Sequence, residues 1–523
     1  MNRRPRRALL AATLLFMGAL GCTDTTELPT STITDTNYFN DPSSYRAFLA
    51  KIYAGLAVSG QQGPSGNGDI QGIDEGFSQY LRLYWEAQEL PTDEAVIAWG
   101  DIGLPEMNTQ LWASNNTFVV SMYYRIAFQV SLANEFLRQT TDAKLTDRNV
   151  SPALKAEIQT FRAEARFLRA LSYWHGIDLF GNIPLVTEAD ELGANPPAQS
   201  TRQAIYDFIV SELTAAQADL PAASGIGTYG RATKEAAAAL LAHVYLNAEV
   251  YTGTPHYAEA LAAAQAAIAG PFSLDPSFRH IFQADNNNSP EIIFPIVQDG
   301  KTTETWGGGT FLVHASCGGS MDPATLGVDG CWWGLRLKAE AYNRFDPADP
   351  RRSFFYTTGQ TVDVTSISDF TKGIPAPKYQ NITSLGVAGS DKTHVDTDFP
   401  VFRLADIYLV AAEALLRTGG DRAQALSYVN ALRERAYGNT SGDITDPQLT
   451  LQFLLDERGR ELLWEAHRRT DLVRFGLFTG GDYVWQWKGG APAGTSTETF
   501  RNLYPLPASE LSANPNLVQN PGY

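Results

Sequence analysis

The 523-residue sequence predicts a mainly α-helical protein, in which paired helices form a scaffold and a loop-rich, strand-poor lobe is inserted into it. Three observations predict this fold class. Apolar residues recur at spacings of three and four in stretches near both ends of the chain. Several of these stretches come in pairs joined by short turns. Residues 271–400 lose the helical period and are rich in Gly, Pro, Asn and Thr.

The first apolar stretches predict two long helices within an N-terminal scaffold part, residues 37–270. The run FVVSMYYRIAFQVSLANEFL, residues 118–137, keeps its apolar side chains on one face. Residues 158–181 carry a similar apolar stripe, and Gly181 ends it. Both runs are long enough to bury one face against neighbouring helices.

Two further sets of stretches predict helix pairs. Residues 231–250 and 256–270 are Ala-rich and are separated by a short turn. Residues 402–420 and 421–436 form a second pair, in which TGGD supplies the helix stop and the next cap. Small residues let helices approach closely, and this arrangement is typical of tetratricopeptide hairpins. The second pair begins the C-terminal scaffold part, residues 401–523.

Residues 271–400 predict the irregular lobe. Their apolar runs are short, with a strand such as EIIFPIV and a helical piece near Leu335–Phe345. Long irregular segments inside a compact protein usually have a function.

The N-terminus predicts export. Residues 1–21 have a basic start and an apolar run that is too short to span a bilayer. Gly21–Cys22 resembles a lipoprotein cleavage site, so Cys22 is the expected lipid attachment point and residues 22–36 a polar tether. A secretory signal without lipid is the alternative.

Composition argues against nucleic-acid binding. The formal net charge is -17 and the pI is near 4.9, so phosphate would be repelled over most of the molecule. The sequence contains no HExxH, CxxC pair or GxSxG motif, and no catalytic residue or metal ligand is predicted. His175 and His243 lie in helical stretches, where core packing is the favoured interpretation.

The segment ERGRELLWEAHRRTDLVRFG, residues 457–476, concentrates charge. Glu461 and Glu465 share a helix face and resemble a catalytic pair. However, Arg458, Arg468 and Arg469 stand three or four residues away, where opposite charges neutralise each other on a helix. We therefore predict a half-buried lattice of ion pairs that fixes the last long helix to the scaffold.

Two cysteines remain after Cys22. Cys317 and Cys331 are a candidate disulfide in an oxidising compartment, closing a Gly-rich loop. Two free thiols are the alternative.

Three long motifs resemble the SusD/RagB family of outer-membrane nutrient-binding lipoproteins. They are FRAEARFLRALSYWHGIDLFGNIPLV, DERGRELLWEAHRRTDLVRFG and the closing YPLPASELSANPNLVQNPGY. The resemblance implies a tetratricopeptide-like scaffold with a ligand-binding lobe. It also implies a non-catalytic partner and hinged lid of a SusC-like TonB-dependent barrel transporter, with no cofactor; bound calcium is left open.

Residues 80–116, expected as a sugar-binding loop, resemble the starch-binding branch of the family, which has a TDE...W-x-D-x-G-(I/V)-P-x-L-N...W run. The resemblance implies that Trp99 stacks on an α-glucan and that Arg82 binds sugar hydroxyls, with Asp101 in the place of the motif's aspartate. The branch has asparagine three residues after the tryptophan, whereas this chain has Ile102.

Two later segments, ETWGGGTF and DGCWWGLR, resemble the loops that complete the aromatic sugar site. They add Trp306 and one of the adjacent pair Trp332 and Trp333 as candidate sugar-binding residues. Sugars present apolar C–H faces and hydroxyl rims, which suit flat aromatic platforms beside polar groups. The remaining tryptophans that we considered, Trp112, Trp174 and Trp464, are assigned to packing.

The favoured function is a surface glycan-binding lipoprotein for starch or maltooligosaccharides, anchored in the outer membrane. The alternative is a transporter lid for another glycan or for peptides, with little ligand binding of its own. A glycosidase would need a carboxylate pair about 5–10 Å apart in an open cleft, and the only close pair evident in the sequence is surrounded by arginines.

Overall fold

A computed structural model describes residues 35–523 except 65, 67, 192 and 194. The chain forms two compact units, residues 1–45 and 46–523. The described part of the first unit contains α2 (Asp35–Tyr38) and the start of α3 (Ser43–Ala57). The predicted signal peptide and nearly all of the predicted tether lie outside the described residues.

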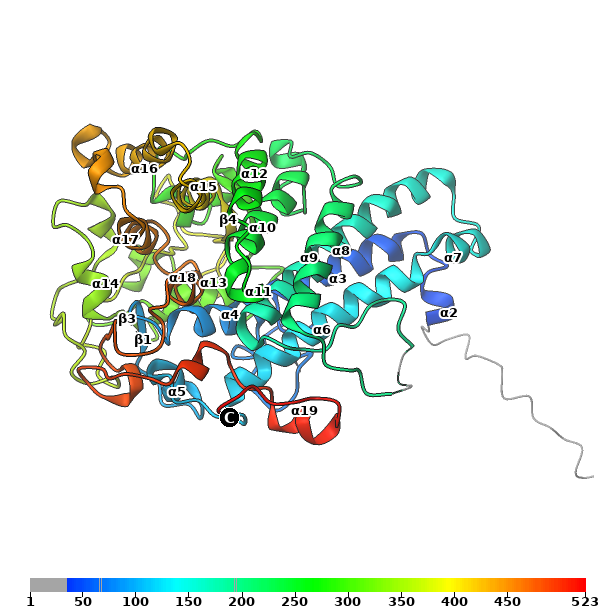
Figure 1. The fold of residues 1–523 in the computed structure, drawn as a ribbon, viewed down its shortest axis with the longest axis horizontal. Coiled ribbons are helices and arrows are strands. Elements are labelled where there is room, and N and C mark those ends of the chain that lie inside the picture. Colours follow the sequence, from blue (N-terminus) through cyan, green and yellow to red (C-terminus); the bar gives the residue numbers. More distant parts are fainter. Residues whose placement is uncertain (1–34, 65, 67, 192, 194) are drawn as a thin grey trace, which may run out of the picture. The chain divides into compact units, whose positions relative to one another are not determined.

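The first half of the second unit is helical. Its helices after α3 are α4 (Tyr80–Glu89), α5 (Leu104–Thr109), α6 (Thr117–Gln139), α7 (Asp142–Asp147), α8 (Pro152–Phe180) and α9 (Arg202–Ala216). The two predicted long helices are confirmed as α6 and α8, which lie side by side (Figure 1). α8 begins six residues before the predicted start, at Pro152, because the Ser151 side chain caps a first turn that has no apolar stripe.

Both predicted helix pairs are confirmed. The first is α10 (Lys234–Leu246) with α12 (Tyr257–Ile268), joined through the short α11 (Ala248–Thr252). The second is α15 (Leu404–Thr418) with α16 (Arg422–Tyr437). α12 contacts both α10 and α15, so the two pairs stack side by side (Figure 1). The contact faces of α10 and α12 are built largely from buried alanines, which allow close approach, whereas α16 packs through Ala425, Val429 and Leu432.

The predicted last long helix is interrupted. α17 (Leu451–Glu461) ends where that helix was expected to continue, and α18 (Arg468–Arg474) starts after a break. Within the break, Trp464 and Ala466 both have φ of 62°, which no α-helix contains. The last helix, α19 (Ala508–Ala513), lies in the closing segment.

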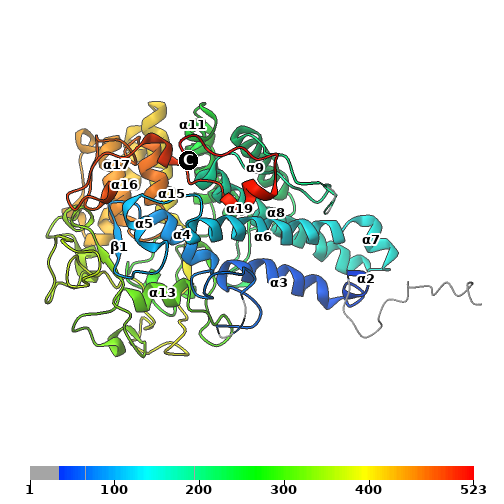
Figure 2. The same cartoon turned by 90° about the horizontal axis from the view of Figure 1, so that it is seen from below.

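The lobe has few regular elements. It contains β2 (Ile292–Ile296), α13 (Gly308–Ala315), β3 (Leu335–Leu337) and α14 (Ala339–Asn343), and β4 (Phe399–Arg403) spans its end. The helical piece expected at Leu335–Phe345 therefore starts as a strand. β3 pairs antiparallel with β1 (Ala95–Ile97), and β2 pairs with β4, so two small sheets join the lobe to the scaffold. Figure 2 shows much of the irregular chain around α13.

Short 3-10 helices complete the fold; they are η1 (Gly225–Gly227), η2 (His280–Phe282), η3 (Asn286–Asn288), η4 (Pro323–Leu326), η5 (Pro350–Phe354), η6 (Thr440–Gly442), η7 (Asp446–Gln448), η8 (Lys488–Gly490) and η9 (Thr499–Asn502). None of the helices in the described ranges is long and apolar enough to cross a membrane. Trp112, Trp174 and Trp464 are buried, as predicted, and so are His175 and His243.

Candidate functional site

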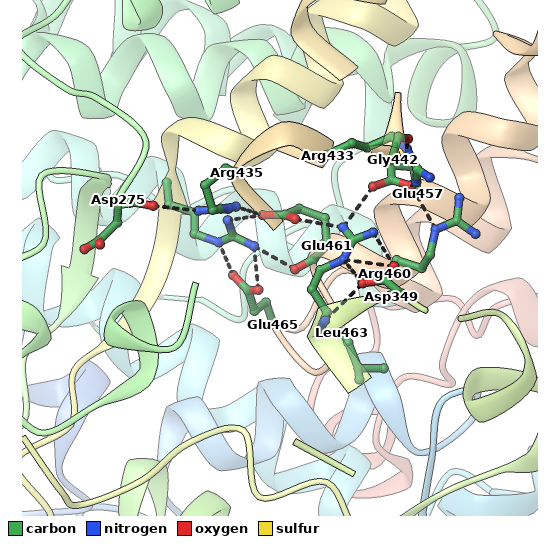
Figure 3. Close-up of polar contacts among 12 residues, drawn as sticks. Asp275, Asp349, Arg433, Arg435, Gly442, Glu457, Arg460, Glu461, Leu463 and Glu465 are labelled. Carbon is green, nitrogen blue, oxygen red and sulfur yellow. Dashed lines mark hydrogen bonds and ion pairs between the residues drawn. The ribbon is translucent and has the colours of Figure 1, made fainter. Parts of the chain in front are cut away.

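The most charge-dense segment of the chain contributes to a buried cluster of arginines and carboxylates. Around Glu461 and Glu465, basic side chains from other elements converge (Figure 3). Arg403 contacts both carboxylates, at 2.8 Å from Glu461 and 2.6 Å from Glu465. We define the arginine–carboxylate cluster as Glu291, Asp349, Arg351, Lys378, Arg403, Arg433, Arg435, Glu457, Arg460, Glu461 and Glu465.

The electrostatics of this cluster are those of a structural lattice. Burial raises the pKa of Glu461, but the guanidinium groups of Arg435, Arg403 and Arg351 outweigh it and bring that pKa to about 2. Burial also raises the pKa of Glu465, and its basic partners bring it below its ordinary value. A general acid needs a raised pKa. The prediction that this segment is scaffolding is confirmed, with full burial in place of half burial.

The partners predicted from helical spacing are wrong. The helix ends at Glu461, before Arg468 and Arg469, and Arg458 pairs with other residues although it shares α17 with Glu461. The basic side chains instead reach distant elements: Arg458 pairs with Asp406 and Asp471, Arg468 with Asp93, and Arg469 with Asp178. The ion pairs therefore connect α17 and α18 to α4, α8 and α15 or to the segments that follow them.

One group of side chains in the described ranges has the composition of a metal site. Potential ligand atoms of His243, Asp406 and His467 lie within 4.8 Å of one another. Asp406 already contacts His243 at 2.5 Å and the Arg458 guanidinium at 3.0 Å. A guanidinium so close opposes a second positive charge, so the group fits a buried ion-pair network.

Three tryptophans from separate segments converge at the surface of the lobe. Trp99 follows β1, Trp306 precedes α13, and Trp332 follows Cys331. The ring centroids of Trp99 and Trp332 are 6.3 Å apart, and those of Trp332 and Trp306 are 6.1 Å apart. Successive ring planes are tilted by 48° and 51°, so neighbouring rings are not coplanar. We call these three residues the tryptophan arc.

The arc is partly open to solvent. The exposed fraction of Trp306 is 36%, and Trp99 and Trp332 are half-buried. Beside Trp99, Asp101 is exposed and Ile102 is 89% exposed. Large apolar side chains grouped at a surface commonly mark a binding site.

Hydrogen bonds and stacking fix Trp332 at the centre of the arc. Its carbonyl oxygen accepts a hydrogen bond from the Trp99 indole nitrogen at 3.0 Å. The His314 ring stacks on the Trp332 ring at 4.6 Å and 20°. The two nitrogens of that imidazole face the carbonyl oxygens of Gly330 and Thr393, at 2.7 and 3.0 Å. These contacts therefore hold the Trp332 ring in place before a ligand binds.

A disulfide joins Cys317 and Cys331, directly before Trp332. The segment after Cys331 also lies against the C-terminal end of α13. The amides of Trp332 and Gly334 donate to the carbonyls of His314 and Ala315 at 2.8 and 2.9 Å. These bonds satisfy carbonyls that the end of a helix leaves without a partner.

Trp306 is fixed by a buried carboxylate and a close glycine. Its backbone amide donates to Glu75 at 3.1 Å, and Thr305 donates its hydroxyl to the same carboxylate at 2.8 Å. A Cβ added to Gly76 would lie 2.6 Å from Trp306 Cβ. The centroid of the His394 ring lies 4.8 Å from that of the Trp306 ring.

Arg82 lies behind the arc, contrary to the expectation that it faces the ligand. Its side chain is 3% exposed and pairs with Glu86 at 2.9 Å. Its guanidinium carbon lies 4.1 Å from the Phe311 ring centroid and 5.4 Å from that of Trp99. Arg82 thus contacts the Trp99 ring from the protein interior through a cation–π interaction, because α4 directs the Arg82 side chain inward.

Glu86, the ion-pair partner of Arg82, is also buried, and its burial changes the pKa of its carboxyl group. Burial raises its pKa to about 7, although Arg82 opposes the change. One oxygen of Glu86 and one nitrogen of Arg82 have no hydrogen-bond partner in the structure.

Of the adjacent pair, Trp332 belongs to the arc and Trp333 does not. Trp333 contacts Phe370, at a ring-centroid distance of 5.5 Å. The segment expected to be a sugar-binding loop, residues 80–116, contains α4, β1 and α5, and its irregular part around Trp99 carries the candidate residues. The expected loop ETWGGGTF is helical from Gly308 onward.

Several supporting residues escaped sequence reasoning: Glu75, Phe311, His314 and His394. The spacing of Phe311 and His314 on one turn of α13, directly after the Trp306–Gly307 loop, is a signal that could have found two of them. Glu75 and His394 come from segments without regular structure, and neither has a local signal.

Two family models match the chain. Residues 324–523 match the model described as SusD family, and residues 89–246 match one described as starch-binding, associating with outer membrane. The chain is 35% identical over 526 residues to the starch-binding protein SusD of Bacteroides thetaiotaomicron, with 91% of each chain covered. It is 25% identical to the SusD-like protein P2 of Formosa agariphila, with 98% of each covered.

Solved structures confirm the predicted fold class. A SusD homolog from Bacteroides thetaiotaomicron has a TM-score of 0.74 at 20% identity, covering 94% of this chain and 98% of that one. The surface glycan-binding protein A from Bacteroides thetaiotaomicron, solved with laminarihexaose, has a TM-score of 0.70 at 21% identity, covering 91% and 98%.

Proposed function

Because this chain belongs to the SusD family, we propose that it is a non-catalytic glycan-binding protein of the cell surface whose ligand is starch or maltooligosaccharide. The observation that carries this proposal is the tryptophan arc, in which three partly exposed rings from separate segments lie next to one another. The starch-binding protein named among its relatives supports the choice of ligand.

The geometry of the arc favours a curved glycan. Each indole offers a flat apolar face for the C–H face of one sugar ring. Rings tilted by 48° and 51° match a chain that bends from one sugar to the next, as a helical α-glucan does. A straight, flat chain would be served better by coplanar rings. Asp101, exposed beside Trp99, is placed to accept hydrogen bonds from sugar hydroxyls.

The proposed role excludes bond chemistry. Glu461 and Glu465 are buried and paired with basic side chains, far from the acid–base state that glycoside hydrolysis requires. Incubation with starch should release no reducing ends, and release above a no-protein control would contradict the non-catalytic role.

The proposal places the protein at the outer membrane. Acylated Cys22 would hold it there through its lipid chains, and the family model that names outer-membrane association supports this location. The protein would pass its glycan to a SusC-like TonB-dependent transporter, over which it acts as a hinged lid. Extraction in mild detergent and affinity purification of this protein should recover a barrel protein in equal amount. Purification without such a partner would contradict the lid role.

Affinity electrophoresis tests the glycan-binding role. We expect amylopectin in the gel to retard the purified protein and Trp99→Ala to abolish that retardation. Trp487→Ala is the matched control, since Trp487 is half-buried elsewhere, its indole donating to the Val364 carbonyl. Retardation by laminarin but not amylopectin would redirect the ligand to a β-glucan. Mobility unchanged by every glucan would leave only the lid role.

A further inference from the structure

Trp333 has a large apolar side chain that is exposed to solvent, and its backbone conformation is unfavourable. Its exposed fraction is 47%. Its φ is 56°, in the left-handed region, which is a genuine outlier for a bulky residue. Strained residues of this kind persist only where the surroundings impose them, and they gather at functional sites.

The surroundings of Trp333 do impose this conformation. Its amide donates to the Cys317 carbonyl at 2.9 Å, between the bonds that its two neighbours make to the end of α13. The disulfide closes the same loop one residue before Trp332. The chain is thereby bent so that the two adjacent indoles meet different neighbours. Trp332 meets Trp99, Trp306 and His314, whereas Trp333 meets Phe370.

A glycine loop lies against Phe370, and polar groups lie beside that loop. A Cβ added to Gly318 would lie 2.4 Å from the Phe370 ring, so only glycine fits against it. The next residue, Gly319, has φ of 64° and lies close to Gln360 and Tyr356. The Tyr356 hydroxyl is hydrogen-bonded to Ser320. Hydroxyl and amide groups therefore lie beside the glycine loop that Phe370 contacts.

This combination repeats the chemistry of the tryptophan arc. A flat, exposed aromatic face suits the apolar face of a sugar ring. The two indoles belong to consecutive residues, whose Cα atoms are about 3.8 Å apart. Trp333 is therefore the residue next to the central ring of the arc.

We propose that Trp333 and Phe370 form a second glycan platform, the outer platform, which binds sugar units of a chain beyond those held by the tryptophan arc. This inference rests on the proposed glycan-binding function and adds a length preference to it. A short oligosaccharide fills the arc alone. A longer chain or a polysaccharide also covers Trp333 and binds more tightly.

The test compares ligand lengths in matched variants. Isothermal titration with maltotriose and with maltooctaose, and affinity electrophoresis with amylopectin, would be run on the wild type, Trp333→Ala, Trp333→Phe and Trp333→Gly. Phenylalanine keeps an aromatic face. Glycine removes the ring while accepting the left-handed backbone, so it separates loss of the ring from backbone change. Thermal unfolding by circular dichroism confirms that each variant is folded.

We expect Trp333→Ala and Trp333→Gly to lower maltooctaose affinity by about five- to tenfold, the effect of losing one aromatic contact. Maltotriose affinity should change by less than about twofold, and Trp333→Phe should retain most of the long-chain affinity.

An equal loss for both ligands, or no loss for maltooctaose, would overturn the outer platform. If Trp99→Ala still abolishes binding in that case, the proposed function stands and only this inference fails. If the wild type binds no glucan of any length, both fail.

Discussion

The arginine–carboxylate cluster and the tryptophan arc are both assembled from segments far apart in the sequence, but they expose opposite chemistry. The cluster buries charged side chains and pairs each carboxylate with basic groups (Figure 3). The arc leaves uncharged rings partly open to solvent. The polar groups of the cluster pair with one another inside the protein, whereas the aromatic faces of the arc remain accessible to a ligand.

This difference teaches that density of titratable residues is a poor guide to the functional site here. Buried charges must be paired, so the crowding in residues 457–476 is what a large charged core requires. The position of the rings in the arc depends instead on a disulfide, on the stacked His314 imidazole and on the close contact with Gly76. None of these features is visible as a charge pattern in the sequence.

The largest expected effect comes from breaking the cluster. Arg403→Ala leaves Glu291, Glu461 and Glu465 without a shared buried partner. Removing one member of a buried pair costs about 3–5 kcal/mol of unfolding free energy. Urea unfolding followed by circular dichroism measures it. As a control, Arg422→Ala removes an exposed pair with Asp446 and should cost less than about 1 kcal/mol. Equal losses for the two variants would contradict the structural role of the cluster.

Acid should break the same region without a mutation. The pKa of Glu461 is lower in the folded chain, about 2, than its ordinary 4.5. Its contribution to stability is therefore present above pH 4.5 and is lost as the pH falls toward 2. A difference of this size corresponds to about 3 kcal/mol for one carboxylate. Unfolding free energy measured from pH 7 to pH 2 should fall mainly below pH 4.5. A flat profile there would show that the cluster is not ionised in the folded state.

The helical scaffold was readable from the sequence because its signals are local. Apolar periodicity predicts α6, α8 and both helix pairs, and Asp421 marks the cap that starts α16. The break between α17 and α18 was not readable, since Trp464 and Ala466 are ordinary helix residues that tertiary contacts hold at positive φ. The ion-pair partners of Arg468 and Arg469 lie hundreds of residues away.

The candidate site was readable only as a set of residue types. The tryptophans were identified by resemblance, but no local signal separates Trp332 from Trp333, because the choice depends on the backbone turn between them. Arg82 was expected at the surface, and its burial follows from how α4 lies against α13. The sequence contains the components of the site, whereas their exposure is decided by contacts between distant segments.

Loss of the Cys317–Cys331 disulfide should lower both the stability of the protein and its glycan binding. Cys317→Ser with Cys331→Ser opens a loop whose ends are 14 residues apart, which costs about 3 kcal/mol in the chain-entropy model. It also frees the segment that positions Trp332. Thermal unfolding and affinity electrophoresis of the double variant should both show a loss, and dithiothreitol should reproduce it in the wild type. Full glycan binding by the double variant would show that the arc needs no such closure.

A smaller effect should come from moving one ring of the arc. A Cβ added at Gly334 would lie 2.9 Å from the Trp99 indole, so Gly334→Ala displaces that ring while every tryptophan remains. We expect an affinity for maltooligosaccharide about threefold to tenfold lower, or up to about 1.4 kcal/mol. Gly330→Ala is the control, because nothing lies within 4 Å of the added atom. Isothermal titration that gave equal affinities for the two variants would contradict the arrangement of Trp99.

The central claim is that the tryptophan arc, and not the arginine–carboxylate cluster, binds the glycan. Isothermal titration of maltoheptaose into Trp332→Ala and Arg460→Ala tests it most directly. Arg460→Ala should stay folded, since Glu457 keeps Arg351 and Arg433 as partners. We predict that Trp332→Ala lowers the affinity at least about tenfold, whereas Arg460→Ala leaves it within about twofold of the wild type. Unchanged affinity in Trp332→Ala, or an equal loss in Arg460→Ala, would contradict the claim.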